Sequence, residues 1–108
     1  MKIDILGTSY KLESRKRADD PKLENANGYC DTSSKRLVVE EILDHPMNLE
    51  DLEEFRQKVT RHEIIHAFLH ESGLSHNSWA NDEEIVDWFA LQFPKMVKVF
   101  EEVKCMGD

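Results

Sequence analysis

Cysteines and long apolar runs are scarce in this sequence of 108 residues. Its two cysteines, Cys30 and Cys105, lie far apart and in no Cys-x-x-Cys arrangement. Neither a disulfide framework nor a thiolate zinc site is therefore expected, and we interpret both thiols as reduced. No stretch approaches the roughly 18 apolar residues of a membrane span, and the first residues lack the apolar core of a signal peptide. We expect a cytoplasmic protein without a membrane partner.

Basic residues are in the minority, because 14 Lys and Arg stand against 22 Asp and Glu and give a formal net charge of −8. An acidic chain repels phosphate backbones, so nucleic acid is not expected as a partner. Hydrophobic residues make up 40% of the chain, which favours a folded core over disorder. This length has room for one such core, so we expect a single domain spanning residues 1–108.

The first forty residues have the pattern of a small sheet. Apolar and polar residues alternate in the first dozen positions on either side of residues 7–9, which predicts a hairpin. Residues 29–31 and 37–39 flank a polar turn and predict two further strands. Residues 13–27 are rich in charged and turn-forming side chains and are interpreted as an exposed loop. We therefore expect a mostly antiparallel sheet of three to four strands.

The second half of the chain has helical periodicity, with apolar residues at intervals of three and four. Asn48 is expected as the N-cap, and Ser72-Gly73 supply the left-handed residue that ends a helix. One long helix of about 24 residues is therefore predicted. Asn81 begins a capping signal for a second helix, and Pro94 fits the first turn of a third. The predicted fold class is α+β, a sheet followed by a long helix and two C-terminal helices.

The long predicted helix contains His-Glu-Ile-Ile-His at residues 62–66, an H-E-x-x-H arrangement. Residues four apart on a helix lie on nearly the same face, so the imidazoles of His62 and His66 can converge on one zinc ion. Glu63 projects beside them, where a general base would act on a water that zinc activates. The motif therefore predicts two zinc ligands and a base.

A catalytic zinc usually has a third protein ligand and leaves its fourth position open. The metzincin pattern requires Gly and His where this chain has Leu69 and Ser72, so that pattern is excluded. Downstream, the chain contains a Glu-x-x-x-Asp pair, Glu83 and Asp87, and in this it resembles the gluzincins, the thermolysin-like enzymes. The resemblance implies that Glu83 is the third ligand, with Glu84 as the alternative. It also implies that Asp87 accepts a hydrogen bond from a ligand imidazole.

The resemblance covers residues 28–95, through Gly-Tyr-Cys-Asp, His-Glu-Ile-Ile-His-Ala-Phe-Leu and Asn-Asp-Glu-Glu-Ile-Val-Asp-Trp. Over this range the sequence is similar to small zincin-like proteins of phages and prophages in Gram-positive bacteria. Phe89-Ala90 also match the end of the E-x-x-A-N-x-F-A stretch of ImmA/IrrE-type peptidases, although Val86 and Asp87 replace its Ala-Asn. The resemblance implies a minimal zincin-like fold and a protein or peptide substrate.

A zinc peptidase also needs a donor to the oxyanion of its tetrahedral intermediate. The candidates are Tyr29, Arg61, His70 and His76, of which we name His70 and His76. His70 continues the row of the two motif histidines by one helical turn, and an exposed helical histidine is the alternative interpretation. In related zincins an edge strand aligns the substrate, and residues 37–39 are either that strand or an ordinary core strand.

The sequence therefore predicts a zinc metallopeptidase of phage or prophage type in which Glu63 is the general base. The alternative is a zinc-binding interaction or regulatory protein whose zincin-like site is not catalytic. A structural zinc site is normally closed by four protein ligands and does not use a base. Three ligands together with Glu63 favour the peptidase.

Overall fold

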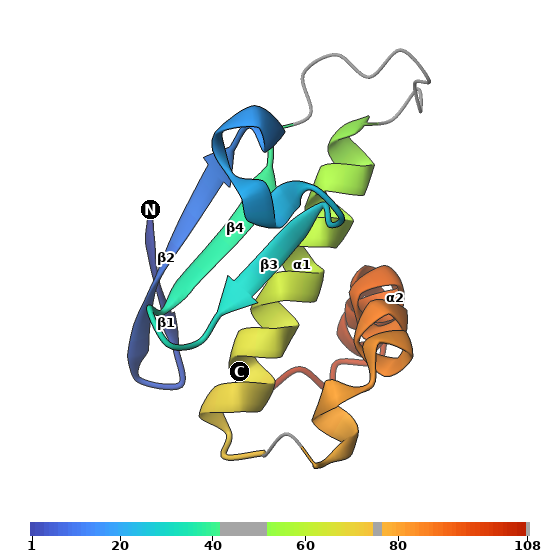
Figure 1. The fold of residues 1–108 in the computed structure, drawn as a ribbon. Coiled ribbons are helices and arrows are strands. Elements are labelled where there is room, and N and C mark those ends of the chain that lie inside the picture. Colours follow the sequence, from blue (N-terminus) through green and yellow to red (C-terminus); the bar gives the residue numbers. More distant parts are fainter. Residues whose placement is uncertain (42–51, 75–76, 108) are drawn as a thin grey trace.

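A computed structural model describes residues 1–41, 52–74 and 77–107 and confirms the α+β class, with a four-stranded mixed sheet followed by two long helices (Figure 1). The strands are β1 (Lys2–Ile5), β2 (Thr8–Arg15), β3 (Gly28–Asp31) and β4 (Arg36–Glu40), and the helices are α1 (Leu52–Glu71) and α2 (Glu83–Glu102). Three short 3-10 helices complete the described elements: η1 (Arg17–Asp19), η2 (Pro21–Leu23) and η3 (Trp79–Asn81). No helix in these ranges is long and apolar enough to cross a bilayer.

The sheet has the strand order β1-β2-β4-β3. The β1–β2 and β3–β4 pairs are antiparallel, whereas β2 and β4 run parallel. The sheet is therefore mixed, and the predicted antiparallel pairing holds for the two hairpins only. The first hairpin turns at Leu6 and Gly7, with φ values of 50° and 91°. Two consecutive positive φ values are typical of a type I′ turn, whose twist matches that of the strands.

Strand β4 lies inside the sheet, between β2 and β3. Leu37, Val38 and Val39 are at most 2% exposed, because both edges of β4 are paired and its faces are covered. The prediction that residues 37–39 form a substrate-aligning edge strand is therefore wrong, and the alternative of a core strand is correct. The sheet edge next to β4 is β3.

The segment 13–27 is only partly the exposed loop that its composition indicates. Strand β2 continues to Arg15 before η1 and η2, and Leu23 in η2 is fully buried. Asp20 is also buried, and its carboxylate accepts hydrogen bonds from the Tyr29 hydroxyl and from Arg15 Nη1. A buried carboxylate needs such partners. Because they come from two different strands, hydropathy patterning along the segment could not predict this network.

Helix α1 packs against the sheet, and the two together form the core. The core cluster takes one residue each from β1, β2, β4 and α1: Ile5, Tyr10, Leu37 and Ala67. Cys30 of β3 and Ile64 of α1 pack against this cluster. Helix α2 packs on α1 (Figure 1). The predicted start of α1 at Asn48 lies outside the described residues.

The C-terminal end of α1 is fixed to the sheet by Glu71. Its carboxylate accepts hydrogen bonds from Thr8 Oγ1 at 2.8 Å, from the Tyr10 hydroxyl at 2.7 Å and from Lys35 Nζ at 2.9 Å. Two residues later Gly73 adopts a φ of 93°, so the predicted glycine terminator is confirmed. These contacts set the position of α1 on the sheet and hence of the histidines that it carries.

One helix, α2, replaces the two helices predicted on either side of Pro94. Proline has no N–H, so the Ala90 carbonyl loses the donor that a residue at position 94 would normally provide. Arg61 Nε of α1 donates to that carbonyl at 2.7 Å. The Arg61 side chain thus replaces the missing helical hydrogen bond, which explains why α2 continues through the proline.

Candidate metal centre

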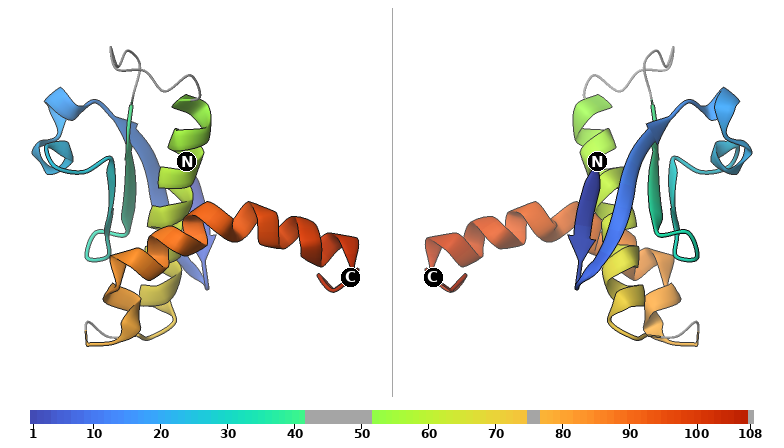
Figure 2. Two further views of the ribbon diagram at one scale, coloured as in Figure 1. Left: turned by 90° about the vertical axis from the view of Figure 1, so that its right-hand side faces the viewer. Right: turned by 90° about the vertical axis from the view of Figure 1, so that its left-hand side faces the viewer.

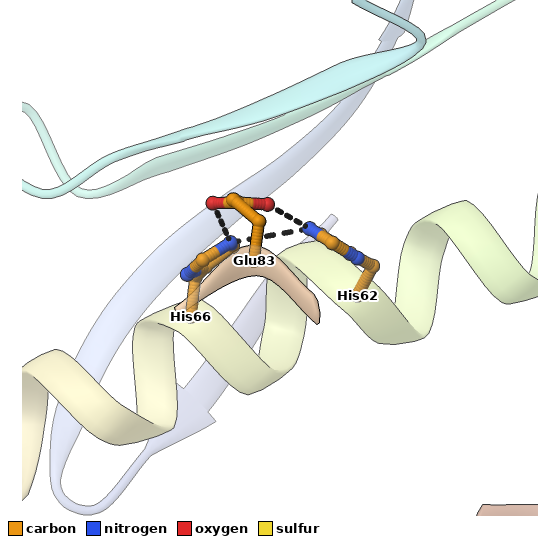
Figure 3. Close-up of side chains that lie close together, drawn as sticks. All are labelled: His62, His66 and Glu83. Atoms are coloured by element: carbon orange, nitrogen blue, oxygen red, sulfur yellow. Dashed lines mark hydrogen bonds and ion pairs between the residues drawn. The ribbon is translucent and has the colours of Figure 1, made fainter. Parts of the chain in front are cut away.

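Two imidazoles from α1 and one carboxylate from α2 converge on a single point. His62 Nε2 and His66 Nε2 lie 3.2 Å apart, and each lies 2.9 Å from one oxygen of the Glu83 carboxylate. Figure 3 shows the three side chains pointing toward one another. One ligand atom of each lies within 4.8 Å of the others. The structure therefore brings together the three residues expected to hold a metal.

These separations fit a zinc ion. Two ligand atoms that each lie about 2.0–2.1 Å from zinc at a tetrahedral angle are about 3.3 Å apart. The 3.2 Å between the two imidazole nitrogens is close to this value, and the 2.9 Å from each nitrogen to the carboxylate is slightly shorter. Two neutral imidazoles and a carboxylate are also a ligand set that zinc enzymes use. The side chains need only a small expansion to accept the ion.

The start of α2 sets the position of Glu83. Asp82 is the N-cap, and its side chain accepts hydrogen bonds from the main-chain N–H groups of Glu84 and Ile85. The sequence prediction of Asn81 as the cap was wrong by one residue, because Asn81 ends η3. Glu83 is therefore the first residue of the helix, where the helix dipole favours a negative charge. Within the described chain, Glu84 is not part of the convergent group.

Asp87, one turn after Glu83, lies behind His62. Its Oδ1 is 3.3 Å from His62 Nδ1, the ring nitrogen that does not face Glu83. Lys58 Nζ lies 3.2 Å from the same oxygen. A carboxylate at this position accepts the Nδ1–H hydrogen bond and leaves Nε2 as the free ligand atom. The geometry matches the role that the resemblance implies for Asp87, whereas nothing in the sequence pattern indicated Lys58.

Glu63 lies beside the two histidines and is only 6% exposed. Burial raises the pKa of its carboxyl from 4.5 to about 7; the electrostatic interaction with His62 lowers this pKa and the interaction with Glu83 raises it further. A carboxyl with a pKa near neutrality can both accept and return a proton at physiological pH. In the metal-free protein, burial therefore gives Glu63 a pKa suited to proton transfer near neutral pH.

Gly28, at the start of β3, leaves room for Glu63. A Cβ on residue 28 would lie 2.8 Å from the Val38 carbonyl oxygen, 3.0 Å from Val59 Cγ1 and 3.3 Å from Glu63 Oε2. A glycine at this position therefore allows β3 to approach α1 closely. In the sequence Gly28 has the appearance of a turn residue at the end of a polar segment. Its role depends on packing between distant elements, which the sequence pattern does not show.

The candidate centre opens into a cleft of about 560 Å³ between β3 and α1, with η3 and the start of α2 at one end. Strand β3 forms the wall opposite the motif histidines, through residues that include Gly28, Tyr29 and Cys30. The volume lies within the range of small-molecule sites. Burial raises the pKa of the Cys30 thiol to about 12, so this cysteine is a neutral part of the wall.

The four candidate oxyanion donors have different surroundings. The Tyr29 hydroxyl donates to Asp20, and Arg61 donates to the Ala90 carbonyl, so both are engaged elsewhere. His70 lines the cleft with its side chain 42% exposed, 3.9 Å from Glu71. His76 lies outside the described residues. His70 and Tyr29 thus both line the cleft, but the Tyr29 hydroxyl and Arg61 Nε each donate to another group.

No family model, curated protein or solved structure matches this chain. Evidence for a function therefore comes from the geometry and chemistry of the site alone.

Proposed function

We propose that this protein is a zinc-dependent peptidase of the zincin type, with His62, His66 and Glu83 as ligands. The observation that carries the proposal is the convergence of these three side chains beside a buried Glu63. A three-ligand site leaves one coordination position open for catalysis, whereas a structural site uses four. The Glu83 side chain is 69% exposed, so the three side chains are accessible from solvent. Both cysteines are free, in keeping with action in the reducing cytoplasm.

A zinc ion held here would polarise the scissile carbonyl and lower the pKa of a water molecule. Glu63 would take a proton from a water molecule as the water oxygen forms a bond to the carbonyl carbon. When the C–N bond breaks, Glu63 returns the proton to the leaving nitrogen, so that one water is consumed and one carboxyl and one amine are formed. Asp87 holds His62 in the tautomer that presents Nε2 to the centre.

Strand β3 is suited to align an extended peptide along the cleft. The N–H of Glu40 donates to the Asn27 carbonyl, and in an antiparallel pair hydrogen-bonded and non-bonded positions alternate. The main-chain groups of Gly28 and Cys30 therefore point away from β4, toward the edge of the sheet. A peptide can add to this edge as a further strand. The substrate we propose is an unstructured segment of a protein.

Metal content tests the first half of the proposal. Elemental analysis of the untagged protein after zinc loading should give one zinc per chain, and His62→Ala or Glu83→Ala should lose it. Glu84→Ala is the matched control, because the adjacent carboxylate lies outside the convergent group, and it should retain zinc. Asp87→Asn should weaken zinc binding about 10- to 100-fold. Retention of zinc by Glu83→Ala together with loss in Glu84→Ala would move the third ligand by one residue.

Hydrolysis tests the second half. Zinc-loaded protein is incubated with a library of unstructured random-sequence peptides, and new termini are identified by mass spectrometry. Cleavage should require zinc and should disappear in Glu63→Gln, which keeps the metal but lacks the base. Equal cleavage by Glu63→Gln would remove Glu63 from the mechanism. Zinc binding without cleavage of any peptide or protein would favour the non-catalytic regulatory alternative.

A further inference from the structure

The second half of α2 extends away from the rest of the protein. Val86 and Ala90, in the first half, are fully buried against neighbouring elements. Beyond Ala90 the helix projects past α1 and the sheet, as both views of Figure 2 show. Three large apolar residues of this half are exposed, Leu91 at 46%, Phe93 at 45% and Val99 at 53%, and so is the C-cap residue Val103 at 63%. The projecting half therefore presents an apolar surface to solvent.

Such a segment needs a partner. Isolated helices shorter than about 12–15 residues are marginal in water, because helical stability in proteins comes mainly from packing. Contiguous apolar surface on a small protein marks an interaction site more often than an accident of composition. The projecting half combines both features, so we infer that another surface covers it.

Three apolar residues of this half and the C-cap residue form a seam with the spacing of a coiled coil: Phe93, Met96, Phe100 and Val103. Phe93 and Val103 are exposed, and Met96 and Phe100 are half-buried. They recur at intervals of three, four and three, which are the a and d positions of a heptad. Leu91 precedes Phe93 by two residues and lies on the opposite side of the helix, because each residue turns the helix by about 100°. The seam is thus one narrow stripe, and Leu91 and Val99 are exposed but do not lie at its a and d positions.

The seam is complementary to itself in an antiparallel pair. The alignment that places Phe93 opposite Val103 of a second copy also places Met96 opposite the second copy's Phe100. In each layer an a position then faces a d position, as in antiparallel coiled coils. A second copy of this chain can therefore cover the seam without any further partner.

The charges favour the same pairing. The chain carries a net charge of −8, but residues 91–104 contain three Lys and two Glu, which gives +1. Repulsion between two copies is therefore weakest at this segment. In the antiparallel pair Lys95 lies on the same side as Glu102 of the second copy, whereas in a parallel pair these two positions lie on opposite sides of the interface.

The size of the surface indicates a weak complex. The helical residues 91–102 span about 18 Å, and one side of the helix offers on the order of 300 Å². Two copies would bury about 600 Å², which is less than the roughly 1,200 Å² of stable interfaces. We propose that the protein forms a reversible antiparallel dimer through the α2 seam.

Sedimentation equilibrium from low micromolar to millimolar concentration tests this dimer. The average mass should rise toward twice that of one chain, and Phe93→Ser/Val103→Ser should weaken association at least tenfold. Both positions are exposed, so the double variant should keep the wild-type circular dichroism. Leu91→Ser is the matched control, since Leu91 is 46% exposed against 45% for Phe93, and it should associate like the wild type.

A single-chain mass at all concentrations would refute the dimer, and so would undiminished association of the double variant. The measurement is repeated with excess chelator and with zinc. The seam contains no residue of the metal centre, so the dimer should form in both. The dimer and the peptidase can therefore fail independently of each other.

Discussion

The buried Glu63 should give the metal-free protein an unusual dependence of stability on pH. In the unfolded chain its pKa has the ordinary value of 4.5, whereas burial raises it to about 7 in the folded protein. Between these values the folded protein keeps a proton that the unfolded chain has lost. The stabilisation is therefore complete below about pH 4.5 and is lost as the pH rises through 7. The difference corresponds to about 3 kcal/mol.

Glu63→Gln isolates this contribution, because the amide has nearly the same shape and does not titrate. Urea unfolding of both proteins is followed by tryptophan fluorescence in the presence of a chelator, from pH 4.5 to 8. The free energy of unfolding of the wild type should fall by about 3 kcal/mol relative to the variant over this range. Groups with lowered pKa values, such as Glu71, titrate below this range and are common to both proteins. Parallel pH profiles for the two proteins would show that burial does not raise the pKa of Glu63.

Three further substitutions test the packing around the site. Arg61→Ala should lower the free energy of unfolding by about 1–3 kcal/mol, because it leaves the Ala90 carbonyl without a donor. In a Pro94→Ala background the new N–H of residue 94 supplies that donor, so the effect of Arg61→Ala should be smaller there. An equal decrease in both backgrounds would contradict the assignment. Gly28→Ala should lower the free energy of unfolding by about 1–3 kcal/mol, because its Cβ would lie 2.8 Å from a main-chain oxygen, and an unchanged denaturation midpoint would refute this. Hydrogen bonds, chiefly from Tyr10, lower the pKa of Glu71 to about 2, so its stabilisation is present above about pH 4.5 and is lost as the pH falls toward 2. Glu71→Gln should therefore flatten the acid limb of thermal stability, and an unchanged limb would exclude this carboxylate as its source.

Local patterns sufficed for the features that depend on neighbouring residues. The four-residue spacing of His62 and His66 placed both imidazoles on one face of α1. Gly73 ends that helix with a positive φ value, which glycine adopts without strain. The two hairpins followed from alternation of apolar residues and from turn composition. In each case the interaction that decides the structure spans only a few positions.

The features that sequence analysis missed depend on contacts between distant segments. A proline usually ends a helix, but Arg61, 29 positions before Ala90 in the sequence, supplies the missing donor and lets α2 continue. The parallel pairing of β2 with β4 makes residues 37–39 interior, although their composition suits an edge strand equally well. Glu63 was assigned from its motif, but its burial depends on how closely β3 approaches α1. Hydropathy patterning reports none of these long-range contacts.

The placement of the ligands on two helices also has a mechanical consequence. His66 and Glu83 are 83 − 66 = 17 positions apart, and a metal that joins them closes a ring in the same sense as a disulfide. A ring of this length lowers the conformational entropy of the unfolded chain, which stabilises the folded protein by about 3 kcal/mol. The metal would then act as a removable cross-link between α1 and α2. A chelator should make the segment between the two helices a preferred site of proteolytic nicking, while the sheet and α1 stay intact.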